Sequence, residues 1–92
     1  MGTCYFNILV LDDEYSQSLI LLTDDGVYTL PTLDIDGGTP KRIFKTSLRS
    51  YKSSMDNPAL ISSKGSGEFE LLIAKSDGSF RSITLLRSYL GV

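Results

Sequence analysis

Ionisable side chains in this sequence are separated by sign, and they are the residue types most able to do chemistry. The first 36 residues hold seven acids and no base, and residues 41 to 52 hold five bases and no acid. A net charge of −2 conceals this local separation. Because complementary charged surfaces guide protein association, we treat both groups as candidate partner-binding residues. The acids are Asp12, Asp13, Glu14, Asp24, Asp25, Asp34 and Asp36; the bases are Lys41, Arg42, Lys45, Arg49 and Lys52.

Catalytic and metal-binding patterns are weak. The sequence has no histidine, which removes the commonest general base and the commonest metal ligand. Cys4 adjoins an apolar run with no neighbouring base, so we expect a buried thiol and not a nucleophile. Asp34 and Asp36 begin like a calcium loop, but Thr39 and Lys45 stand where that loop needs glycine and glutamate. We therefore predict a protein that is not an enzyme and has no cofactor and no metal site.

Length and composition predict a small globular protein. The 92 residues fit one domain, residues 1–92, and the hydrophobic content of 41% is enough for a core. A single cysteine favours a reducing compartment. The first residues lack the basic start of a signal peptide, and no apolar run approaches the roughly 20 residues that cross a bilayer. We expect a soluble, cytoplasmic protein without membrane contact.

Strand patterns surround two tight turns. The run CYFNILVL is almost continuously apolar and predicts a central strand covered on both faces. Two apolar runs flank Asp24-Asp25-Gly26, which predicts a hairpin whose second strand ends at Pro31. A second hairpin is expected in residues 68–86, with its turn at Asp77-Gly78. Residues 83–90 fit either a strand or a last helical turn.

The basic segment predicts a helix over about residues 40–54. Thr39 is a good N-cap and Pro40 suits the first helical position. The following apolar residues are spaced by four, three and four, and the bases line a second stripe, which is most simply a solvated face. With residues 53–67 as a loop, the expected fold is α+β: an antiparallel or mixed sheet of four or five strands that packs against one amphipathic helix. The apolar helix face would be Phe44, Leu48, Tyr51 and Met55.

The order of strand pair, acidic glycine-containing loop and Thr-Pro helix start has a counterpart in a known family. It resembles the opening of a Nudix hydrolase domain over residues 18–51, through Tyr28, Leu30, Pro31, Ile35, Asp36, Gly38, Thr39, Pro40 and Leu48. The resemblance departs where the family binds magnesium, because no glutamate lies between Glu14 and Glu68. It therefore implies a catalytically inactive, nucleotide-binding domain.

These patterns favour a non-enzymatic binding or inhibitory module that acts through its acidic and basic surfaces on a protein partner. Acids on loops of a rigid sheet could imitate a phosphate backbone, as in small phage-type inhibitors. Nucleic acid is a poor partner for a protein whose pI is about 4.8. Two alternatives stay open: the inactive Nudix-like domain, and a subunit of a homo-oligomer whose opposite patches meet head to tail.

Overall fold

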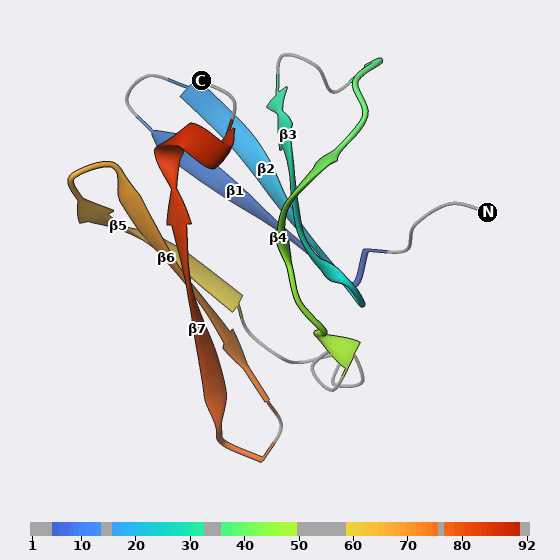
Figure 1. Ribbon diagram of the computed structural model, residues 1–92, viewed down its shortest axis with the longest axis vertical. Helices are drawn as coiled ribbons and strands as arrows, with labels where there is room; N and C mark the ends of the chain where they lie inside the picture. Colours follow the sequence, from blue (N-terminus) through green and yellow to red (C-terminus); the bar gives the residue numbers. More distant parts are fainter. Residues whose placement is uncertain (1–4, 14–15, 33–35, 50–58, 76, 91–92) are drawn as a thin grey trace.

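The computed structural model describes residues 5–13, 16–32, 36–49, 59–75 and 77–90. In these residues the chain forms seven strands, followed by one turn of 3-10 helix, which Figure 1 shows in chain order. The strands are β1 (Asn7–Asp13), β2 (Ser16–Thr23), β3 (Gly26–Pro31), β4 (Lys41–Lys45), β5 (Ala59–Gly65), β6 (Glu68–Ala74) and β7 (Phe80–Leu86), and the helix is η2 (Arg87–Leu90).

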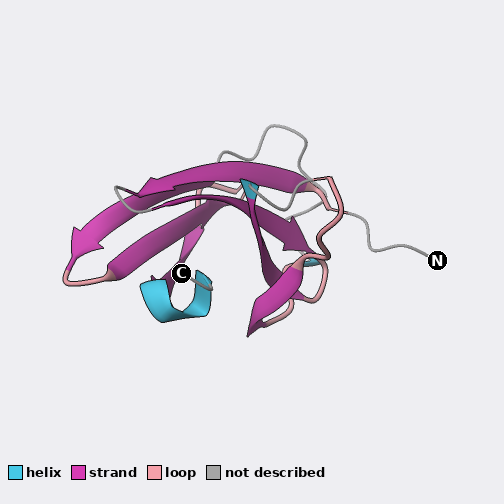
Figure 2. Cartoon of the chain, turned by 90° about the horizontal axis from the view of Figure 1, so that it is seen from above, coloured by secondary structure: helices cyan, strands magenta, loops and turns pink. Residues whose placement is uncertain are grey.

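The strands form two antiparallel sheets. The first has the order β1-β2-β3-β4 and the second β5-β6-β7, so within each sheet every strand pairs with its neighbours in the chain. Consecutive strands commonly lie side by side in this way. The strands curve, and η2 lies on their concave side (Figure 2).

One hydrophobic core joins the two sheets. Ile20 and Val27 of the first sheet and Leu71 of the second are fully buried in the same cluster. On β6, the buried residues alternate with half-buried ones, as expected for a strand with one face toward a core. Leu48, which follows β4, is also fully buried in this cluster. The core therefore depends on residues from both sheets and from the segment after β4.

Both predicted hairpin turns are confirmed. Asp24 and Asp25 form the turn between β2 and β3, and β3 ends at Pro31. Gly26 has a φ of 148°, and a Cβ there would lie 2.1 Å from the Phe44 carbonyl oxygen. Glycine is thus required for β3 to approach β4. In the second hairpin, Gly78 has a φ of 93° in the turn between β6 and β7.

The predicted helix over residues 40–54 is wrong where it can be compared. Lys41–Lys45 forms strand β4, which pairs with β3 from Thr29 to Gly26. Ile43 is the extra residue of a bulge opposite the Val27/Tyr28 step, and this bulge breaks the alternation that would mark a strand in the sequence. The α+β assignment is therefore wrong: the described residues are nearly all β. Residues 50–54 lie outside the described residues, as do Tyr51 and Met55.

Other expectations about the strands also change. The run that includes residues 7–11 forms β1, an edge strand and not a central one. Within the expected loop 53–67, residues 59–65 form β5, whereas 53–58 lie outside the described residues. The ambiguous segment 83–90 is strand to Leu86 and then 3-10 helix. No helix in the described ranges is long and apolar enough to cross a membrane.

Candidate functional site

Acidic and basic residues that are separated in the sequence meet at one end of the first sheet. Lys41, Arg42 and Lys45 are exposed on β4, and Arg42 Nη1 lies 3.2 Å from Asp25 Oδ2 in the β2–β3 turn. This contact follows from strand pairing. Because β4 runs antiparallel to β3, Lys45 at its end pairs with Gly26, which directly follows the turn. The predicted acidic and basic surfaces are therefore not separate here.

Asp25 is the centre of a small hydrogen-bonded cluster. Its carboxylate accepts hydrogen bonds from the Thr23 hydroxyl, from the Tyr28 hydroxyl at 3.1 and 3.2 Å, and from Arg42. Thr23 contributes most to a pKa of Asp25 below its ordinary value, with Tyr28 and Arg42 acting in the same direction. Desolvation, followed by the bond to Asp25, raises the pKa of Tyr28. The Tyr5 ring, just before β1, packs edge-on against Tyr28.

Some of the other predicted site residues lie near this cluster, and the rest lie elsewhere in the sheet or its loops. Asp24 is half-buried, and with Asp25, Lys45 and Arg49 it lines a shallow depression of about 490 Å³. Asp12 is exposed on β1, at the opposite edge of the sheet. Asp36 is exposed in a loop, and Asp13 is described only as the last residue of β1. Glu14, Asp34 and Lys52 lie outside the described residues. Among the residues described, no group of three acidic or cysteine side chains is placed to hold a metal ion.

The two sheets are tied together on the side of β4 and β7. Past β4, the N–H groups of Thr46 and Leu48 donate to the carbonyl oxygens of Asp25 and Asp24, at 3.2 and 2.9 Å. Arg81 of β7 donates from Nη1 to the Ser47 carbonyl oxygen at 3.3 Å. Residues 46–48 thus bond to both sheets. The exposed lysines of β4 are the kind of side chain that discourages further strand pairing at a sheet edge.

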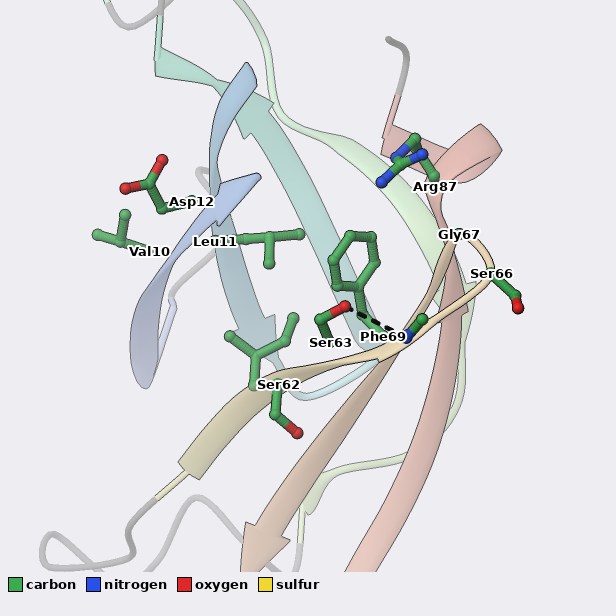
Figure 3. A pocket seen from close by; sticks show the side chains of 11 residues that line it. Val10, Leu11, Asp12, Ser62, Ser63, Ser66, Gly67, Phe69 and Arg87 are labelled. Carbon is green, nitrogen blue, oxygen red and sulfur yellow. Dashed lines mark hydrogen bonds between the residues drawn. The ribbon is translucent and has the colours of Figure 1, made fainter. Parts of the chain in front are cut away.

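On the opposite side, edge strands β1 and β5 lie close together without pairing. A groove of about 700 Å³ lies there, within the range of about 300–1,000 Å³ typical of ligand clefts. In Figure 3, Leu11 of β1 points toward Phe69 of β6, and Arg87 stands beyond the Phe69 ring. Leu11 and Phe69 are 5% and 2% exposed, and Ile61 of β5 packs against the same cluster. Three apolar side chains therefore lie at the base of the groove, largely covered by the core.

Backbone polar groups and turn residues complete the groove. Val10 and Asp12 line it although their side chains lie on the far side of β1, so they contribute main-chain atoms (Figure 3). Ser63, Ser66 and Gly67 line the β5–β6 end, where the Ser63 hydroxyl accepts a hydrogen bond from the Gly65 N–H at 3.3 Å. The exposed lining of the groove is thus more polar than apolar, with Leu11, Ile61 and Phe69 at its base.

The hydrogen bonding of β1 shows which of its backbone groups face the open edge. The Ile8 N–H donates to the Asn7 side-chain oxygen at 2.9 Å and not to β2. Because alternate residues of an antiparallel strand turn their N–H and C=O groups to the same side, Val10 and Asp12 also face the open edge. The Ile8 N–H is already bonded to the Asn7 side chain, so the backbone groups of Val10 and Asp12 are the ones left for a partner.

Comparisons with protein-family models, with curated proteins and with solved structures gave no match. The Nudix resemblance of residues 18–51 therefore stays a prediction, and β4 lies where that resemblance implies a helix.

Sequence reasoning missed the groove. Its residues come from the first strand, from residues 61–69 and from Arg87, so they are distant along the chain. The available signal was the apolar run around Leu11, which we interpreted as a central strand. The same run fits an edge strand whose outer side chains are left exposed.

Proposed function

We propose that this protein is a non-enzymatic protein-binding module that captures an extended segment of its partner in the groove between β1 and β5. The observation that carries the proposal is the unpaired β1 edge, with backbone groups of Val10 and Asp12 facing a groove that has Leu11, Ile61 and Phe69 at its base. The proposal keeps the class of function predicted from the sequence and moves the binding surface to the groove, where Asp12 is the one predicted acidic residue among the described lining residues.

Strand addition is the binding mode that suits this geometry. An extended peptide that pairs with a sheet edge gains main-chain hydrogen bonds, and pockets beside the edge select its side chains. The side chains that turn inward would meet Leu11, Ile61 and Phe69, which are positioned by three different strands. Apolar burial then contributes affinity, at about 25 cal/mol per Å² of apolar surface removed from water.

The other edges are less suited to a partner strand. On β4, Lys41, Arg42 and Lys45 are exposed, and a bulge interrupts the pairing with β3. On β7, Arg81 is engaged with the carbonyl oxygen of Ser47. Among the described side chains and pairs of β1 there is neither a bulge nor a side chain bonded to the other sheet, so we place the partner strand at β1.

Peptide selection provides the test. Random 12-residue peptides displayed on phage would be selected on the full chain, and the affinities of enriched peptides measured by isothermal titration. We expect binders whose N-methylation at alternate residues abolishes binding, because each methyl group removes a donor from the ladder. This modification leaves the protein itself unchanged.

Two variants locate the binding site. Val10→Pro removes the outward N–H, and an edge strand tolerates proline at such a position; Val10→Thr keeps both the N–H and a β-branched side chain. We expect Val10→Pro to abolish binding and Val10→Thr to retain it. Failure to select any peptide, or binding that is indifferent to N-methylation, would overturn the proposal even if Val10→Pro did not fold.

A further inference from the structure

We infer that the captured segment is apolar at consecutive positions and carries a lysine or arginine opposite Asp12, an inference that rests on the proposed function. Strands at a half-solvated sheet edge normally alternate apolar and polar residues. The structure points to a different pattern, because both faces of β1 are apolar beside the open edge.

The inner face of the added strand must be apolar. Leu11 and its neighbours across the groove, Ile61 and Phe69, belong to or pack against the buried core. A side chain opposite Leu11 therefore turns toward the same interior. An apolar side chain placed against these three residues removes apolar surface from water, whereas a polar group there could bond only to polar residues of the rim such as Ser63.

The outer face is also apolar. Ile8 and Val10 are 56% and 57% exposed, unusually open for large aliphatic side chains that lie side by side on one face. They pair across the strand with Leu21 and Leu19, which are buried and half-buried. A residue directly opposite Val10 lies on this same face. An aliphatic or aromatic side chain there covers Val10 and extends the apolar row of β1 and β2.

Charge defines one end of the segment. Asp12 is exposed on the outer face, two residues beyond Val10, and its cross-strand neighbour on β2 is the neutral Gln17. A base opposite Asp12 forms a cross-strand pair of opposite charge, whereas an acid there is repelled. At the other end, Asn7 occupies the Ile8 N–H and limits the ladder. The occupant is therefore a short apolar segment with a base at one end.

Three biased peptide libraries test the pattern, displayed on phage at one copy per particle. Each has a five-residue centre: apolar throughout, apolar at odd positions with serine at even ones, or the reverse, between random flanks. We expect the continuous apolar library to give binders about tenfold tighter than the alternating ones, since several cross-strand pairs are added. If an alternating library wins, this inference fails while the proposed function stands. If no library yields a binder, both fail.

The charge at the end of the segment has its own test. In the best binder, the position nearest Asp12 is changed between lysine and glutamate, and we expect lysine to bind about two- to fivefold more tightly. Asp12→Lys should reverse that preference. Asp36→Lys makes the same change of charge at an exposed residue distant in sequence from β1, and should not reverse it. A preference for glutamate with the unaltered chain, or one that Asp12→Lys leaves unchanged, would overturn the assignment of a base.

Discussion

Arg42 Nη1 lies 3.2 Å from Asp25 Oδ2, and this contact joins the basic strand β4 to the acidic turn between β2 and β3. The same carboxylate accepts hydrogen bonds from Thr23 and Tyr28. Charges that lie seventeen residues apart in the sequence thus act together on one turn. The cluster therefore connects the β2–β3 turn to β4.

Removing Asp25 should destabilise the protein more than removing Arg42. Asp25→Ala takes away the acceptor of three side chains, whereas Arg42→Ala takes away one exposed partner. We expect Asp25→Ala to give the lower Tm by circular dichroism, with Arg42→Ala between it and the wild type. Lys41→Ala, at the exposed neighbouring residue, is the control and should change Tm least. Equal effects of Asp25→Ala and Lys41→Ala would show that the cluster does not hold the turn.

Stability should fall in acid partly through Asp25 and Asp77. Hydrogen bonds from Thr23 and from Ser79, respectively, are the main causes of a pKa below the ordinary value of 3.8 in each carboxyl group. A lowered pKa in the folded state stabilises the fold above pH 3.8, and this contribution is lost as the pH falls through the folded-state pKa. Tm should therefore decrease as the pH falls below 3.8.

Two substitutions connect that acid dependence to its residues. Asp25→Asn and Asp77→Asn should each make the decrease in Tm shallower, because the amide does not titrate in this range. Asp12→Asn replaces an exposed carboxylate on β1 and serves as the matched change. An unchanged slope in the Asp25→Asn Asp77→Asn double variant would contradict the assignment.

Leu48 should be essential for joining the sheets on their tied side. It is fully buried, so Leu48→Ala removes core contacts and leaves a cavity, at a cost of about 2–5 kcal/mol in the free energy of unfolding. Leu60→Ala is the same chemical change at a residue that is 60% exposed, and should cost within about 0.5 kcal/mol. Urea unfolding of both variants measures the difference. Similar losses at the two positions would argue against a core that includes residues 46–48.

Thr29→Val should stabilise the protein. The Thr29 hydroxyl is buried, and it has no hydrogen-bond partner within the described part of the chain. Valine has nearly the same shape and removes the polar atom, so we expect a gain of about 1 kcal/mol in the free energy of unfolding. Thr84→Val, on the exposed face of β7, is the control and should be nearly neutral. A loss of stability in Thr29→Val would indicate that the hydroxyl is satisfied, for example by a buried water.

The elements that could be predicted from the sequence are those encoded locally. Gly26 and Gly78 adopt positive φ values that favour glycine, and Pro31 ends a strand because it cannot donate a hydrogen bond. Phe69 and Ile73 alternate with more exposed residues, so the sequence also predicted which face of β6 turns inward. Each of these features depends on a residue and its immediate neighbours.

The location of the groove could not be predicted in the same way. It exists because Leu11 on the edge of one sheet faces Ile61 and Phe69 of the other, about fifty residues later. The sequence identified the charged residues, but their separation along the chain predicted separate surfaces and not the contact between Arg42 and Asp25. Pairing between distant residues decides both outcomes, and a local pattern does not specify it.

By itself the sequence determined the turns, the alternation of the hairpin strands and the lack of histidine chemistry, since these depend on residue type and short spacing. Only the tertiary structure decided that Lys41–Lys45 is a strand and that β1 is an edge. The spacing of the apolar residues after Pro40 predicted a helix there, and no strand was expected. The helix signal at Thr39 and Pro40 is worth about 1 kcal/mol, and backbone pairing with β3 together with burial of Leu48 outweighs it.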